Sequence, residues 1–124
     1  MAGLTLDAGA LIAYERGDPR VREILATAFA RGAVPTVPAM ALAEVWRGDA
    51  KDARVARLLK ACAFEPVTEP LARLTGKLRR DTPDAGTIDA SIAVGVSQRC
   101  DAIATSDPKD MLRLLGPGST ILAV

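Results

Sequence analysis

Four acidic residues in this sequence have the type and setting that metal-dependent chemistry requires. Asp7 and Asp107 each directly follow a short apolar run. Asp89 stands in the apolar segment TIDASIA, and Glu44 stands in PAMALAEVW. All-oxygen ligand sets favour hard cations such as Mg²⁺ or Mn²⁺, which can activate a water molecule and stabilise the charge that grows on a phosphate. If these side chains converge, the sequence predicts a metal site suited to phosphodiester chemistry.

Each acid, taken singly, also has a structural explanation. Asp7 can cap backbone N–H groups in a turn, and Asp107 stands before a proline, as favoured helix N-caps do. Asp89 can complement a helix dipole from a first turn. Glu44 is surrounded by apolar residues on nearly every helical face, so we expect it to be buried and to need a cation, either Arg47 or a metal ion. These residues alone leave both explanations open.

The composition narrows the chemistry further. The chain has 124 residues and no histidine, which excludes imidazole zinc ligands and Ser-His or Cys-His nucleophile pairs. The two cysteines, Cys62 and Cys100, lie far apart without metal-ligand spacing, as is typical of a reducing compartment. No apolar run approaches the roughly 18 residues of a membrane span, and the N-terminal segment lacks signal-peptide features. We therefore expect a cytoplasmic protein with no membrane association.

Short apolar runs alternate with amphipathic segments along the chain. This alternation predicts an α/β fold in one domain over residues 1–124, with a mainly parallel central sheet flanked by helices. Because the carboxyl ends of parallel strands share one edge of the sheet, Asp7 and Asp107 are expected to project from the same edge. The expected strands are 3–6, 36–37, 63–67, 102–105 and 120–124, and the expected helices are about 39–47, 88–98 and 108–115, with others along the apolar stripes of 21–29, 55–62 and 71–78.

Basic residues are concentrated in one part of the chain, although the net charge is only +1. Residues 47–80 carry nine Lys and Arg against four acids, while the remainder carries seven against eleven. This stretch is either a solvated helix face or a surface that binds phosphates. In the second case Arg47, Lys51 and Arg54 are the candidate substrate contacts. The four aromatic residues are too few and too scattered to form a stacking platform for single strands.

Read together as LTLD, ALAE, TIDASIA and ATSD, the acidic segments resemble the PIN-domain ribonucleases over essentially the whole chain. Within that family the sequence is similar to the small toxins of VapBC-type toxin–antitoxin pairs. Four motifs in the family order carry the resemblance: Asp7, Glu44, Asp89 with Ile92 and Ala93, and Thr105 with Asp107. One departure is Gly9, where the family often has Ser or Thr, so a hydroxyl that could orient a metal-bound water is missing.

The resemblance implies a PIN-like sandwich fold and a Mg²⁺- or Mn²⁺-dependent endoribonuclease that acts as a toxin. It implies that Asp7, Asp89 and Asp107 are metal ligands and that Glu44 binds metal directly, binds it through water, or helps to activate the nucleophile. Thr105 would support the site through its hydroxyl. The implied partners are RNA, a small cognate antitoxin and a second copy of the chain in a homodimer.

Other function classes fit the sequence less well. A receiver-type module needs an acidic pair before a separate phospho-accepting aspartate, and a dehalogenase-like phosphatase needs a second aspartate at the position of Gly9. The glycine-rich motifs of dinucleotide and P-loop proteins are also missing. The alternative that stays open is a degraded PIN-like fold that binds RNA or a protein without cleaving it.

Overall fold

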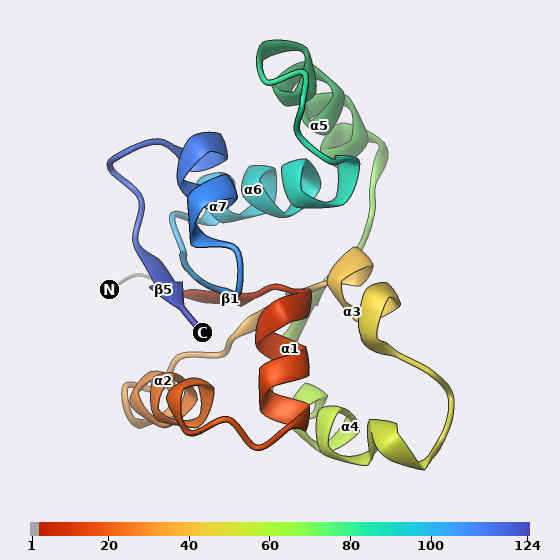
Figure 1. The fold of residues 1–124 in the computed structure, drawn as a ribbon, viewed down its shortest axis with the longest axis vertical. Coiled ribbons are helices and arrows are strands. Elements are labelled where there is room, and N and C mark those ends of the chain that lie inside the picture. The colour runs from red at the N-terminus through yellow and green to blue at the C-terminus, as the bar shows by residue number, and fades with distance from the viewer. Residues whose placement is uncertain (1–2) are drawn as a thin grey trace.

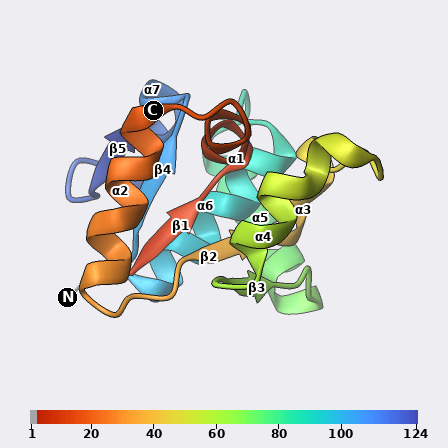
Figure 2. The same cartoon turned by 90° about the horizontal axis from the view of Figure 1, so that it is seen from below.

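The computed structural model describes residues 3–124 and contains one five-stranded sheet in which every pairing is parallel (Figures 1 and 2). The predicted α/β fold is therefore confirmed. The strands are β1 (Leu4–Leu6), β2 (Thr36–Pro38), β3 (Ala63–Glu65), β4 (Ala102–Thr105) and β5 (Ile121–Ala123), and their order in the sheet is β3-β2-β1-β4-β5. This order places β1 at the centre, with β4 beside it.

Helices cover both faces of the sheet, as a parallel sheet requires. They are α1 (Ala8–Glu15), α2 (Pro19–Ala30), α3 (Ala39–Val45), α4 (Ala53–Leu59), α5 (Glu69–Asp81), α6 (Thr87–Arg99) and α7 (Pro108–Leu115), with a short 3₁₀ turn at Ala50–Asp52. Figure 1 shows α5, α6 and α7 above the sheet and α1, α2 and α4 below it. Among residues 3–124, no helix is long and apolar enough to span a membrane.

The core lies on both sides of β1 and β4. Leu6, Leu11, Ile92 and Ile103 are among the largest side chains that are fully buried. The pairing of Leu6 with Ala104 brings the two strands to the same edge, where the Asp7 N–H donates to the Ala104 carbonyl at 3.2 Å. The end of the central strand pair thus brings Asp7 beside the residues that follow β4.

Two helices differ from the sequence prediction. Helix α1 was not predicted, because AGALIAYE is apolar on most sides and shows no helical stripe. Helix α3 ends at Val45 rather than near Arg47, since the backbone N–H of Arg47 donates to the Asp52 carboxylate and turns away from the helix.

Some stripe residues are also less buried than their spacing indicates: Phe29 is 40% exposed and Leu74 is also 40% exposed. Both cysteines are free thiols, and Cys62 is half-buried whereas Cys100 is exposed.

Candidate metal centre

Asp7 is a buried carboxylate at the point where β1 becomes α1. Its Oδ1 accepts the Ala10 N–H at 2.9 Å, so it caps the helix as well as standing at the sheet edge. Burial raises the pKa of Asp7, and repulsion from Asp89 raises it further, while hydrogen bonds from Thr105 and from the helix N–H groups oppose the shift. The cap and the site therefore use the same side chain, and the two explanations considered for Asp7 do not exclude one another.

Three further aspartates gather beside this edge. Asp89 lies in the first turn of α6, Asp107 immediately precedes α7, and Asp110 lies in the first turn of α7. One carboxylate oxygen of each lies within 4.8 Å of the others. Asp107 occupies the N-cap position of α7, but its side chain makes no capping hydrogen bond. Its carboxylate is instead close to those of Asp89 and Asp110. Asp7 is not in this close group, but it repels Asp89 and hydrogen-bonds Thr105, so we name Asp7, Asp89, Asp107 and Asp110 the acidic cluster.

The electrostatics show that these carboxylates disfavour one another's charge. Burial, followed by repulsion from Asp107 and Asp110, raises the pKa of Asp89. A hydrogen bond with Asp107, together with the repulsion between the two groups, raises the pKa of Asp110. In the part of the chain that the structure describes, the cation recorded in contact with the cluster is Arg113, which lies 3.5 Å from Asp110 and 2.7 Å from Asp84.

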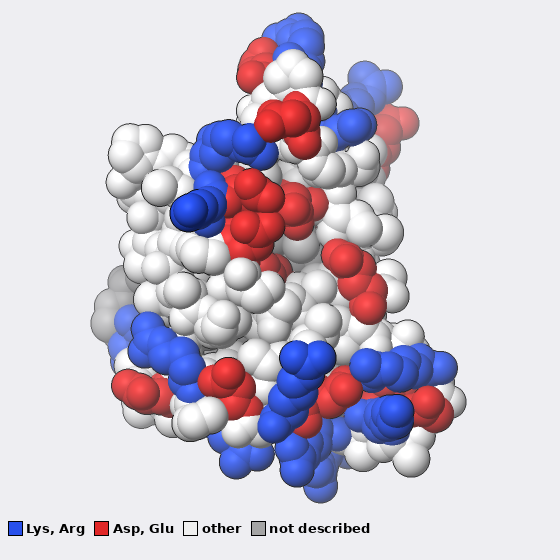
Figure 3. Space-filling model, in the orientation of Figure 1, with Lys and Arg blue, Asp and Glu red and all other residues white. Residues whose placement is uncertain are grey.

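The carboxylates of the acidic cluster offer only oxygen ligands, and the recorded basic side chain does not neutralise all of their charge. Such a set of ligands fits a hard divalent cation. Figure 3 shows acidic side chains gathered near the centre of one face, flanked by Lys and Arg.

Thr105 links two members of the acidic cluster. It is fully buried at the end of β4, and its Oγ1 accepts the Asp107 N–H at 2.9 Å. The same side chain hydrogen-bonds Asp7. A hydroxyl can accept one hydrogen bond while donating another, so Thr105 fixes Asp7 and Asp107 relative to each other.

The expected burial of Glu44 is wrong. Its side chain is exposed, because the buried face of α3 is formed by Ala41 and Val45, and the small residues around Glu44 do not cover it. Glu44 is not a member of the carboxylate group that could share one metal ion among the described residues. Apolar neighbours in the sequence show which residues are available for packing, but not which of them reach a given side chain.

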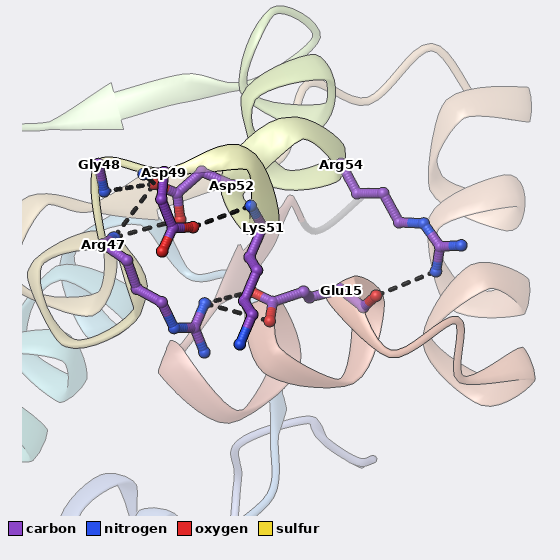
Figure 4. A network of polar contacts seen from close by, with 7 residues as sticks. All are labelled: Glu15, Arg47, Gly48, Asp49, Lys51, Asp52 and Arg54. Atoms are coloured by element: carbon purple, nitrogen blue, oxygen red, sulfur yellow. Dashed lines mark hydrogen bonds and ion pairs between the residues drawn. The ribbon is translucent and has the colours of Figure 1, made fainter.

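Of the two cations considered for Glu44, Arg47 does not pair with it among the described residues. The Arg47 guanidinium instead forms an ion pair with Glu15 at 2.9 Å, as Figure 4 shows. Arg54 donates to the Glu15 carbonyl at 3.0 Å, and the Lys51 side chain extends towards the Glu15 carboxylate. The three candidate RNA contacts thus surround the end of α1 rather than the acidic cluster.

Asp110 was not selected from the sequence as a site residue. In the sequence, DPKD is typical of a helix start, in which an acid at position 110 supports the first turn. The available signal was its spacing, since residues three apart in a helix lie on neighbouring faces. Asp107 and Asp110 could therefore have been recognised as a pair.

The comparisons with known proteins agree with this architecture. The sequence model of the PIN domain family matches residues 4–114, and the chain therefore belongs to the PIN domain family. The search of curated proteins finds no match to the sequence.

Several solved structures share the fold. One match is a chain of VapBC2 from Rickettsia felis, whose structure was solved with a DNA fragment from the VapBC2 promoter. The TM-score is 0.77 and the sequence identity is 14%, over 98% of both chains. A chain of DNA-bound VapBC from Salmonella typhimurium matches with a TM-score of 0.71 and 19% sequence identity, over 98% of this chain and 97% of the other. A chain of FitAcB from Neisseria gonorrhoeae matches with a TM-score of 0.68 and 20% sequence identity, over 96% of each chain. At these identities the likeness is one of fold.

Proposed function

We propose that this chain is a Mg²⁺- or Mn²⁺-dependent endoribonuclease that hydrolyses RNA phosphodiester bonds. The observation that carries the proposal is the convergence of Asp89, Asp107 and Asp110, with Asp7 beside them, at the carboxyl edge of the central strands. Membership of the PIN domain family supports it. The retention of all these carboxylates favours an active nuclease over a degraded fold that only binds RNA or protein.

The acidic cluster would hold the cation through carboxylate oxygens of Asp89, Asp107 and Asp110, with Asp7 as a further ligand. When bound, the cation supplies Lewis acidity to a phosphate oxygen and makes a water molecule more acidic. Thr105 holds Asp7 and Asp107 in place. Because Glu44 is exposed and not in the close carboxylate group, we propose that it acts through water and not as a direct ligand of the cation.

RNA phosphates would be held by basic side chains away from the acidic cluster. Arg47, Lys51 and Arg54 are exposed and lie together at the end of α1. Arg47 has a carboxylate partner, Glu15, so binding a phosphate there would require it to share or exchange that ion pair. We keep these three residues as the proposed substrate contacts.

Purified protein incubated with a mixed RNA pool tests the nuclease. We expect cleavage with Mn²⁺ or Mg²⁺, no cleavage with EDTA, and no cleavage by Asp89→Asn at any metal concentration. Asp81→Asn, which changes an exposed acid at the end of α5, is the matched control and should cleave as the wild type does. RNA binding without metal-dependent turnover would favour the degraded fold instead.

We further propose that the chain is the toxin of a toxin–antitoxin pair, with a small antitoxin as its protein partner. Three of the matched structures are VapBC or FitAB complexes bound to DNA, and the sequence resemblance points to the same class. Expression of the chain alone should arrest growth, and co-expression of the small protein encoded beside it should relieve the arrest. Growth unaffected by an active nuclease would contradict the toxin assignment.

Self-association as a homodimer is also proposed. Apolar side chains are exposed on and near α5, where Val67 is 55% exposed and Leu74 is 40% exposed. They lie beside grooves between α5 and its neighbour α6. Exposed apolar surface of this kind is common where proteins associate. Light scattering at high micromolar concentration should give twice the 13.0 kDa mass of one chain.

A further inference from the structure

The Ser106 side chain occupies the space that a side chain at position 9 would fill. An ideal Cβ placed on Gly9 would lie 2.5 Å from the Ser106 Cβ and closer still to its Oγ. A side chain at position 9 and the serine in its present position therefore exclude one another. The absence of a Cβ at Gly9 lets the segment between β4 and α7 seat its serine against the first turn of α1.

This position places the Ser106 side chain against Gly9, whose backbone N–H hydrogen-bonds Asp7 of the acidic cluster. Thr105, on one side of it in the chain, binds Asp7, and Asp107, on the other side, belongs to the cluster. The Thr105 hydroxyl is already engaged, since it accepts the Asp107 N–H and hydrogen-bonds Asp7. In the part of the chain that the structure describes, no hydrogen-bond partner is recorded for the Ser106 hydroxyl, and the residue is exposed.

The chemistry of the site calls for a donor at this place. Ionised carboxylates only accept hydrogen bonds, and a phosphodiester that approaches them carries further acceptors. A serine hydroxyl donates without adding charge. We propose that Ser106 contacts the substrate by donating a hydrogen bond to a non-bridging oxygen of the RNA phosphate at the acidic cluster. This inference rests on the proposed ribonuclease function and names a substrate contact within it.

The test exchanges the hydroxyl between the two positions. Filter binding of RNA is measured in an Asp7→Asn background, which prevents cleavage, and steady-state cleavage is measured in the active protein. Ser106→Ala should weaken RNA binding by about ten-fold and raise KM, because a hydrogen bond to a charged group is lost. Gly9→Ser combined with Ser106→Gly should recover most of the affinity, since the new Oγ would lie about where the Ser106 Oγ lies now.

A matched control separates the hydroxyl from its packing. Gly9→Ala combined with Ser106→Gly fills the same space without a hydroxyl. Its Tm should be close to that of Gly9→Ser combined with Ser106→Gly, but it should bind RNA as weakly as Ser106→Ala does. Recovery by the alanine exchange, or unchanged affinity and KM in Ser106→Ala, would overturn the inference while leaving the nuclease intact. If the wild type itself neither binds nor cleaves RNA with Mn²⁺, both this inference and the proposed function fail.

Discussion

At the scale of single residues, the acidic cluster combines groups that destabilise one another until a cation arrives. Asp89 is partly buried, and its pKa is raised by burial and by Asp107 and Asp110. Asp89→Asn should therefore raise the free energy of unfolding of the metal-free protein. The gain should be only about 1 kcal/mol, because the site is partly open to water. The same change should abolish RNA cleavage, because a carboxylate that holds the cation is lost. A denaturant melt beside the RNA assay checks both, and a large loss of stability would mean that Asp89 acts mainly as a helix cap.

The raised pKa values of Asp7 and Asp89 also set how stability depends on pH. Their folded-state values lie above those of the unfolded chain, so their contribution to stability is fully present below the unfolded pKa and is lost as pH rises through the folded pKa. The stability gained from metal binding depends on pH in the opposite direction: it increases as pH rises, because only the ionised carboxylates bind the cation. We expect the rise in Tm on adding Mn²⁺ to shrink as pH falls from 7 towards about 4. A Mn²⁺ effect that is constant across this range would contradict binding at the acidic cluster.

At the scale of elements, α6 is fixed to the sheet by a partly buried ionic network. Arg99 at the end of α6 contacts Glu65 on β3 and donates to Asp101 at 2.9 Å and to Thr5 on β1 at 2.9 Å. A Cβ on Gly95, one turn earlier, would lie 2.5 Å from both Glu65 carboxylate oxygens. The glycine thus allows Glu65 to pass beside α6 and reach Arg99, and the helix that carries Asp89 is held in place by the contact.

Substituting Gly95 therefore tests the network against ordinary helix propensity. Alanine in place of a helical glycine usually stabilises a protein by about 0.5–1 kcal/mol. Gly95→Ala should instead destabilise it by about 1–2 kcal/mol, because Glu65 must move away from Arg99. Gly76→Ala on α5 is the matched control, since nothing lies within 4 Å of its added Cβ, and it should show the usual gain. Equal gains in thermal melts of the two variants would show that Glu65 moves without cost.

The loop between α3 and α4 depends on one carboxylate in a similar way. Asp52 is 3% exposed and accepts the backbone N–H groups of Arg47, Gly48 and Asp49, at 2.6 Å for Gly48 (Figure 4). Asp52→Ala should cost about 2–3 kcal/mol, because three donors lose their acceptor. Asp49→Ala removes the exposed bond from the Lys51 N–H and the Asp49 half of a capping box with Asp52, and it should cost about 1 kcal/mol. Chemical denaturation gives the free energy of unfolding of both variants. Similar losses of stability in the two would show that the loop keeps its conformation without Asp52.

Local signals in the sequence determined which of these elements could be predicted. The ranges predicted for β4 and α7 agree with the structure to the residue, because Asp-Pro begins α7 and Gly116 ends it. Helix α1 could not be predicted, since a segment that is apolar on most sides carries no stripe. Strand ends predicted that Asp7 and Asp107 lie at one edge of the sheet, the family resemblance added Asp89, and Asp110 was missed. The positions of Glu44 and Arg47 depend on packing and on Asp52, and no local pattern encodes either.

At the scale of the whole molecule, the basic stretch of the sequence divides into two surfaces. Arg47, Lys51 and Arg54 lie at the end of α1 on one side of the acidic cluster, and the basic residues of α5 lie on the other side. Figure 3 shows Lys and Arg above and below the central acidic side chains. An RNA strand that reaches the carboxylates must approach like charge, so it needs basic side chains on its path. Linear charge counts could not show which of the two surfaces serves this purpose.

Paired neutral substitutions in an Asp7→Asn background distinguish the two surfaces. If Arg47 and Lys51 contact phosphates, changing both to Gln should weaken RNA binding across all sequences and reduce the slope of log affinity against log salt by about 1.4, since each single-strand contact contributes about 0.7. Arg73→Gln with Arg80→Gln is the matched control, because these α5 side chains are 78% and 72% exposed and make only surface ion pairs. Thermal melts should stay close to the parent for both pairs. A reduced slope in the α5 pair alone would transfer the RNA path to that helix, whereas unchanged slopes in both would remove the basic stretch from the binding surface.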